Sequence, residues 1–328
     1  MAGNISSEKI DLLVYGPNKP IVDNGFSDQF VLHAAETRAD LDRLSPAVAA
    51  KIRGAAVTYS TARCDGGVMG LFPKLEIVAS FGVGYDHVDA KYASEHKIVV
   101  TNTPDVLTEE VADIALGLLI ATLREFVKAD RYLRSGLWTT QQFPLSVGSL
   151  RDRKVGMVGM GRIGQAIGRR LEASKVPVVY HSRNPAPGVS YKHYPDLIEM
   201  AKAVDTLVVI VPGGPSTAKM VNADVMKALG PRGVIINVAR GSVVDEVAMI
   251  AALKSGAILA AGLDVFANEP AVPDELKAMQ NVVLLPHIGS ASVVTRNAMD
   301  QMVVDNLKTW FAGKPPLTPI AETPVTSR

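Results

Sequence analysis

Three polar residues in the second half of the chain, Arg240, Glu269 and His287, have the side chains needed to reduce a carbonyl group next to a carboxylate. Arginine presents a planar fork that binds a carboxylate or reaches the neighbouring carbonyl oxygen. Histidine titrates near neutral pH, and a carboxylate against it favours the protonated ring, so a proton stays available for the oxygen that becomes a hydroxyl. Together they fit hydride transfer to a 2-oxo acid, with His287 as acid/base and Glu269 as its partner.

Each of these residues also has an ordinary structural interpretation. Arg240 could cap the end of a strand, Glu269 could be a loop acid before Pro270, and His287 could be a structural histidine. The stretches that contain them, NVARGSVVDE, GLDVFANEP and LLPHIGSAS, lie at the ends of apolar runs, and open α/β sheets collect their ligands at the carboxyl ends of strands. We therefore expect the three side chains to meet at one edge of a sheet.

A glycine-rich turn precedes these residues in the stretch VGMVGMGRIGQAIGRRL. Its three glycines, Gly159, Gly161 and Gly164, stand where a predicted strand ends and a helix begins. In dinucleotide-binding folds the first glycine permits a tight turn, the second admits a pyrophosphate, and the third lets the helix pack on the strand. Amides at the helix start then face the phosphates. A turn built only for packing is the alternative, but the strand before it and the helix after it favour dinucleotide binding.

The next apolar run, VPVVYHSRN, bears on which dinucleotide is bound. Proteins that bind NAD place an Asp or Glu about 20 residues after the glycines, where it grips the ribose hydroxyls. This chain has Ser182 there, followed by Arg183. A hydroxyl beside a guanidinium can hold a 2′-phosphate that a carboxylate would repel, so NADPH is favoured over NADH. The alternative is that Arg183 is only a solvated loop charge.

Short apolar runs that alternate with helical patterns predict an α/β protein with parallel sheets. Five runs fall before residue 103: DLLVYG, FVLHAA, AAVTYS, LEIVAS and KIVVTN. Six more follow Lys154 and would form one doubly wound sheet: KVGMVGM, PVVYHS, TLVVIVP, GVIINVA, AILAAGLDV and NVVLLPH.

The length of 328 residues and a break at Asn102-Thr103-Pro104 predict two domains. We expect a dinucleotide-binding domain at 104–291 and a discontinuous substrate-binding domain at 1–103 and 292–328. The last amphipathic stretch, SASVVTRNAMDQMVVDNLKTWFAG, is expected to return to the first domain, followed by a proline-rich tail without regular structure.

The composition argues against several other functions. The 34 basic and 33 acidic residues nearly balance without a basic block, so no nucleic-acid partner is expected. No apolar run reaches the ~18 residues of a membrane span. The single cysteine, Cys64, suits a reducing cytoplasm and reads as a plain thiol rather than a nucleophile. No metal is expected, because the histidines do not have the spacing of metal ligands. They stand at positions 33, 87, 96, 181, 193 and 287.

With these residues identified, the chain resembles the D-2-hydroxyacid dehydrogenase family, in particular its NADPH-dependent glyoxylate/hydroxypyruvate reductases and the similar hydroxyphenylpyruvate reductases. The resemblance runs from about Leu75 to Pro316. Its motifs occur in the family's order: FGVGYDHVD, TNTPDVLTEEVADIALGLL, VGMVGMGRIGQAIGRR, NVARGSVVDE, GLDVFANEP and LLPHIGSAS.

The resemblance implies a role for each matching residue. Arg240 would bind the substrate carboxylate and carbonyl, His287 would be the acid/base, and Glu269 its partner. The loop SFGVGYDH would hold the carboxylate through main-chain amides at Val83 and Gly84. Cofactor contacts are implied for Met160, Gly161, Arg162, Ile163, Ser182, Arg183, Asn184, Val238 and Asp264. The implied architecture is a flavodoxin-like and a Rossmann-like domain around a cleft, usually in a homodimer.

Two other functions stay open at this point. The residues that set pocket size lie in the poorly matched first 75 positions, so the substrate could instead be a larger aromatic or branched 2-oxo acid. A dinucleotide-sensing binding protein without turnover is the alternative from another class. Tyr85 and Trp138 could touch substrate, the latter from a partner subunit, although ordinary packing is favoured for Tyr85 and explains Trp138 at least as well.

Overall fold

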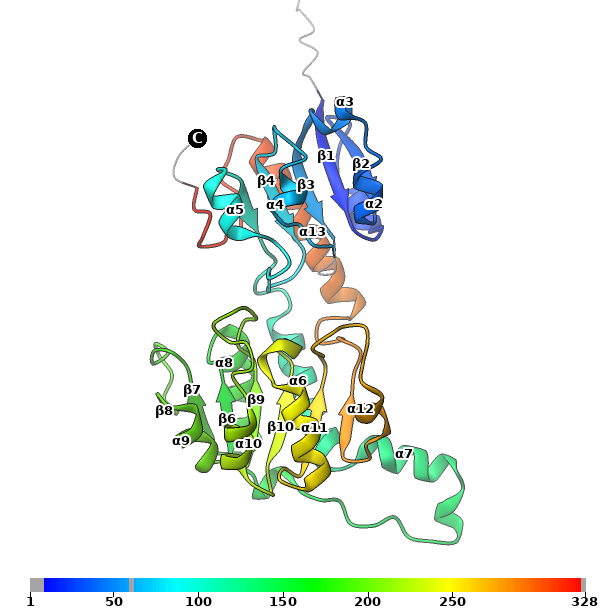
Figure 1. Cartoon of the computed structure of the whole chain (residues 1–328), viewed down its shortest axis with the longest axis vertical. Helices are drawn as coiled ribbons and strands as arrows, with labels where there is room; N and C mark the ends of the chain where they lie inside the picture. The colour runs from blue at the N-terminus through cyan, green and yellow to red at the C-terminus, as the bar shows by residue number, and fades with distance from the viewer. Residues whose placement is uncertain (1–8, 59–61, 326–328) are drawn as a thin grey trace, which may run out of the picture. The chain divides into compact units, whose positions relative to one another are not determined.

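The computed structural model describes residues 9–58 and 62–325, and divides the chain into two compact units. One comprises Met1–Leu107 with Ser292–Arg328 and the other Thr108–Ala291 (Figure 1). The first boundary falls after Leu107, whereas the boundary predicted from the sequence falls after residue 103. The second falls between 291 and 292.

The sheet of the first unit consists of parallel strands that each overlap one of the five apolar runs of the sequence. They are β1 (Ile10–Tyr15), β2 (Phe30–Ala35), β3 (Ile52–Val57), β4 (Ile77–Ser80) and β5 (Val99–Thr101). Their spatial order over the described residues is β2-β1-β3-β4-β5, the arrangement of flavodoxin-like folds. Tyr59 and Ser60 of the run AAVTYS lie outside the described residues.

Helices pack on this sheet, and the last of them comes from the far end of the chain. They are α1 (Pro20–Asn24), α2 (Arg38–Leu41), α3 (Pro46–Ala49), α4 (Gly66–Met69), α5 (Ala90–Glu95) and α13 (Val293–Phe311). Helix α13 packs against β3, β4 and α1, so the chain does return to its first unit. Its buried face repeats every four residues at Met299, Val303 and Leu307.

The second unit has a parallel sheet of seven strands within the described residues. They are β6 (Val155–Val158), β7 (Val178–His181), β8 (Lys192–Tyr194), β9 (Thr206–Val209), β10 (Val234–Asn237), β11 (Ala260–Leu263) and β12 (Val282–Leu284). The order β12-β11-β10-β9-β6-β7-β8 is the doubly wound Rossmann arrangement with one further strand. The prediction of six strands was wrong by one: the short strand β8 is mostly polar, because it lies at the sheet edge and needs no apolar run.

Helices and 3-10 turns complete this unit (Figure 1). The α-helices are α6 (Thr108–Leu123), α7 (Phe126–Arg134), α8 (Arg162–Ala173), α9 (Leu197–Lys202), α10 (Ala223–Leu229), α11 (Glu246–Ser255) and α12 (Asp274–Ala278). The 3-10 turns are η1 (Leu137–Thr139), η2 (Leu150–Asp152) and η3 (Gly241–Val243). Helix α6 buries its apolar face against α8 and strands β10 to β12, which places it in the unit with the glycine turn. No helix in the described residues is long and apolar enough to cross a bilayer.

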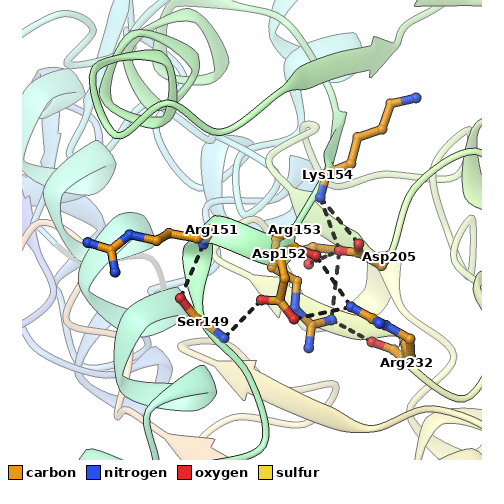
Figure 2. A network of polar contacts seen from close by, with 8 residues as sticks. Ser149, Arg151, Asp152, Arg153, Lys154, Asp205 and Arg232 are labelled. Carbon is orange, nitrogen blue, oxygen red and sulfur yellow. Dashed lines mark hydrogen bonds and ion pairs between the residues drawn. The ribbon is translucent and has the colours of Figure 1, made fainter.

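A polar network anchors the amino end of β6 (Figure 2). The almost fully buried guanidinium of Arg153 donates from Nη1 to the carbonyl oxygen of Arg232 (2.6 Å) and lies 3.7 Å from Asp205 Oδ1. The amide of Lys154 donates to both oxygens of Asp205, and Arg232 pairs with Asp152 at 3.2 Å. These contacts fix β6 against its neighbours, and thereby the glycine turn at its other end.

Candidate active site

The glycine turn joins β6 to α8, and each of its glycines has a distinct geometry. Gly159 has a φ of +108°, and a Cβ there would lie 2.9 Å from the carbonyl oxygen of Ile210. A Cβ on Gly164 would lie 2.5 Å from the carbonyl oxygen of Gly159, so the helix packs directly on the turn. Gly159 and Gly164 thus have the turn and packing geometry expected of them.

Gly161 differs from both, since a Cβ built there would meet nothing within 4 Å. It is the N-cap of α8, and the first amides of that helix have no partner inside the helix. Arg162 and Ile163 form the first turn, while Met160 before them is buried. Open space in front of helix amides that have no acceptor within their own helix fits a dinucleotide phosphate.

The loop after β7 contains Ser182, Arg183 and Asn184. The guanidinium of Arg183 is exposed and makes no hydrogen bond or ion pair with the described part of the chain, and segment 182–190 has no acidic residue. Ser182 Oγ donates to the carbonyl oxygen of Asn184 (2.6 Å). Ser182 could donate a hydrogen bond to a phosphate only if this bond to Asn184 broke. Arg183 has no such bond to break before it contacts a phosphate.

The contact expected between His287 and Glu269 is present. His287 Nδ1 lies 2.7 Å from Glu269 Oε2, and the other carboxylate oxygen accepts the amide of Phe266 at 3.0 Å. Burial raises the pKa of Glu269, but hydrogen bonds from His287 and Phe266 and the charges of His287 and Arg240 outweigh it, so the pKa is lowered overall. With Nδ1 donating to an ionised carboxylate, Nε2 is the ring nitrogen left to transfer a proton.

The backbone around His287 is held by a buried acid at the end of β11. His287 has a left-handed φ of +53°, and its amide donates to the carbonyl oxygen of Asp264 at 2.9 Å. The carboxylate of Asp264 accepts the amides of Ile288 (2.7 Å) and Gly289 (2.8 Å), while burial raises its pKa. Both oxygens of Asp264 therefore bind the loop that carries His287, a role that the sequence did not indicate.

Arg240 lies between β10 and η3, where the chain passes very close to the loop after β11. Its Nη1 donates to the carbonyl oxygen of Ala239 at 2.8 Å, and its charge helps to lower the pKa of Glu269. A Cβ on the next residue, Gly241, would lie 1.8 Å from the carbonyl carbon of Phe266. The absent side chain lets the two loops touch, so Arg240, Glu269 and His287 belong to one cluster. Val238, before Arg240, is buried.

The predicted carboxylate loop of the first unit follows β4. Gly82, with φ +119°, donates its amide to Thr103 Oγ1 (2.9 Å), and the Asn102 side chain donates to the carbonyl oxygen of Val83 (2.9 Å). The amides of Val83 and Gly84 have no acceptor among residues 9–58 and 62–325. Asn102 and Thr103 were not expected as supports, although their place at a strand end was a signal.

The structure also places three other residues that the sequence singled out. Tyr85 donates its hydroxyl to Glu322 at 3.0 Å, and burial together with this acid raises the pKa of Tyr85 to about 12. Trp138 is 65% exposed, so packing within this chain does not explain it. Cys64 is buried, and burial raises its pKa to about 12, which makes it an inert thiol. The described residues contain no group of three or more potential metal ligands.

A doubly wound sheet with a glycine turn and a carboxylate-bound histidine at its strand ends defines a dinucleotide-dependent dehydrogenase. Residues 116–289 match the family model described as "D-isomer specific 2-hydroxyacid dehydrogenase, NAD binding domain". The chain belongs to this family.

Relatives cover nearly the whole chain. A glyoxylate/hydroxypyruvate reductase A of Arabidopsis thaliana is 45% identical and a hydroxyphenylpyruvate reductase of Plectranthus scutellarioides is 43% identical, each over 95% of this chain and 99% of the relative. Among solved structures, the chain is similar to an NADPH-dependent glyoxylate/hydroxypyruvate reductase from Sinorhizobium meliloti in complex with NADP and malonate. That match has 54% identity and a TM-score of 0.91 over 98% of this chain and 99% of that one.

Proposed function

We propose that this protein is an NADPH-dependent reductase of small 2-oxo acids, which converts glyoxylate to glycolate and hydroxypyruvate to D-glycerate. The observation that carries the proposal is the 2.7 Å contact between His287 and Glu269, in one cluster with Arg240, in a dinucleotide-binding unit. The reductases at 45% and 54% identity support the choice of substrate. NADH is expected to serve less well, because Ser182, followed by Arg183, stands after β7 where NAD-binding proteins have an acid.

Bound NADPH would supply a hydride to the keto carbon of the substrate. Arg240 would bind the carboxylate and polarise the keto oxygen, and His287 Nε2 would donate a proton to that oxygen. Glu269 would stabilise the protonated ring through Nδ1. The amides of Val83 and Gly84 would bind the substrate carboxylate. Met160, Gly161, Arg162, Ile163, Val238 and the segment 182–184 would contact the cofactor.

The test is a set of steady-state rates with NADPH and NADH on glyoxylate, hydroxypyruvate and phenylpyruvate. We expect glyoxylate and hydroxypyruvate to be reduced with NADPH, and failure to oxidise NADPH with any small 2-oxo acid would refute the proposal. Faster turnover of phenylpyruvate or hydroxyphenylpyruvate would favour the second candidate, which the 43% identical hydroxyphenylpyruvate reductase supports. A wild-type protein that binds NADPH without any turnover would instead be a sensor, whereas loss of turnover only in His287→Ala identifies an enzyme.

We further propose that the protein is a homodimer formed through the segment 126–147. Neither α7 nor η1 has a buried residue, and large apolar side chains cluster along this segment. The apolar side chains of this segment that are at least two-fifths exposed are Phe126, Val127, Leu133, Leu137, Trp138, Leu145 and Val147. An apolar surface of this extent on a water-facing segment is typical of a contact with a second copy.

Light scattering tests the dimer. We expect a mass of twice 34.9 kDa for the wild type and of one chain for Leu133→Lys/Trp138→Lys. A wild-type monomer at micromolar concentration would refute this assignment. A cytoplasmic location is proposed on the lone buried thiol, Cys64, which suits a reducing compartment. Fractionation of the source cells tests the location.

A further inference from the structure

The strand that the sequence did not reveal, β8, holds the loop that would face the cofactor's ribose. In the register of β7 and β8, Tyr180 lies opposite His193 and His181 opposite Tyr194. The segment between these strands starts at Ser182 and contains prolines at 185 and 187, which restrict its backbone. Its conformation therefore depends on how its two ends are attached to the sheet.

His193 makes one attachment by reaching across from β8. Its Nε2 lies 2.9 Å from the carbonyl oxygen of Ser182, and since a carbonyl only accepts, Nε2 carries the proton. The imidazole also lies 5.1 Å from the Tyr180 ring, in a tilted arrangement. The bond fixes the peptide that immediately precedes Arg183.

Tyr180 makes a second attachment, further along the same loop. Its buried hydroxyl accepts the amide of Ala186 at 3.0 Å. The segment from Ser182 to Ala186 is therefore held at both ends by side chains of the sheet. The exposed Arg183 lies between the two anchors, on a backbone that is ordered before any ligand arrives.

We propose that His193 is a positioning residue for recognition of the 2′-phosphate of NADPH. Its bond to the Ser182 carbonyl holds Ser182 and Arg183 in a conformation that receives the phosphate. The loop therefore loses less conformational entropy when the phosphate binds. The inference rests on the proposed NADPH preference and adds a residue, outside the loop itself, on which that preference depends.

The experiment measures binding of two adenine nucleotides by calorimetry, without turnover. Adenosine 2′,5′-bisphosphate and adenosine 5′-monophosphate differ only in the 2′-phosphate, so the ratio of their dissociation constants isolates its recognition. We expect His193→Phe, which retains a ring against Tyr180 but loses the donor, to bind the bisphosphate about five- to tenfold more weakly, as for one lost hydrogen bond. Affinity for the monophosphate should change less than twofold.

His193→Gln is the conservative variant, because its amide nitrogen can still donate near the position of Nε2. It should restore bisphosphate affinity to within about threefold of the wild type. Tyr180→Phe removes the other anchor and should weaken the bisphosphate selectively, which keeps the inference testable if His193→Phe does not fold by circular dichroism. His96→Phe is the matched control: that histidine stacks on Tyr92 and bonds its carbonyl oxygen at 2.8 Å in the other unit, so the ratio should not change.

The outcomes separate this inference from the proposed function. A wild type that binds both nucleotides equally refutes the NADPH preference, and the inference with it. A wild type that prefers the bisphosphate, together with a folded His193→Phe that prefers it equally, overturns the inference alone. Equal weakening of both nucleotides would show a general structural role for His193 and would overturn it as well.

Discussion

Replacing Gly241 by alanine tests whether close contact between two loops keeps Arg240 beside Glu269. The added Cβ would lie 1.8 Å from the carbonyl carbon of Phe266, 2.0 Å from its oxygen and 2.3 Å from the amide nitrogen of Ala267. The preferred distance between two non-bonded carbon atoms is about 3.5–4.0 Å, so the loops must move apart by roughly 1.5 Å. All three obstructing atoms belong to the backbone, so no side-chain rotation relieves the clash.

A displacement of about 1 Å at an active site can cost about 10²-fold in rate, so we expect kcat/KM of Gly241→Ala to fall at least about 100-fold. Overpacking should also lower the free energy of unfolding by about 1–3 kcal/mol. The assays are steady-state kinetics with glyoxylate, NADPH titration by fluorescence, and urea denaturation. Cofactor affinity should change little, since the glycine turn after β6 is untouched.

Gly117→Ala is the matched control, because its Cβ would meet nothing within 4 Å and its position in a helix favours alanine. It should retain kcat/KM and gain up to about 1 kcal/mol of stability. Activity of a folded Gly241→Ala within threefold of the wild type would refute the argument that contact between the loops positions Arg240.

Four further outcomes are expected. Glu269→Gln should lower kcat/KM about 10- to 100-fold with NADPH affinity retained, because a charge-assisted hydrogen bond to His287 is lost; unchanged kcat/KM would contradict the pairing. Since the pKa of Glu269 is lowered from 4.5, its stabilising interaction is fully present above that value and is lost as pH falls through the lower folded pKa. The difference in unfolding free energy between wild type and Glu269→Gln should therefore shrink below about pH 4.5, measured by urea denaturation. Asp264→Asn should reduce kcat about tenfold while NADPH affinity stays constant, since an amide group accepts only one of the two amides that the carboxylate holds; a loss of NADPH affinity alone would show a cofactor contact instead. Arg183→Ala should raise KM for NADPH at least tenfold and leave KM for NADH unchanged, and equal effects on both would make Arg183 a mere surface charge.

The secondary structure was largely readable from the sequence, because a parallel strand buried on both faces needs an uninterrupted apolar run. The strand β6 illustrates this, as each of its residues is buried. The strand β8 was missed because it lies at the edge of the sheet, where no apolar run is needed. Its residues stay partly exposed, so Lys192 and His193 are allowed there. That omission also hid the bond between His193 and Ser182.

The types of residue at the site could be predicted as well, since carboxylate binding, proton transfer and phosphate binding each require a particular side chain or a missing one. Arg240, Glu269, His287 and the glycines after β6 were proposed as site residues on this basis. The residues that hold the loops of the site in place, Asp264 and Thr103, were not predicted in that role. Asp264 accepts main-chain amides and Thr103 accepts the amide of Gly82, and no residue pattern signals a bond whose partner is a backbone group of another loop.

The sequence alone determined the chemistry available and the run of buried strands, because both depend on side-chain type and on local apolar patterning. Only the tertiary structure decided which groups meet. His287 and Glu269 are 18 positions apart in the chain, yet their atoms lie 2.7 Å apart, because adjacent parallel strands β11 and β12 end at the same edge of the sheet. The contact between Gly241 and Phe266 arises in the same way, from neighbouring strands β10 and β11.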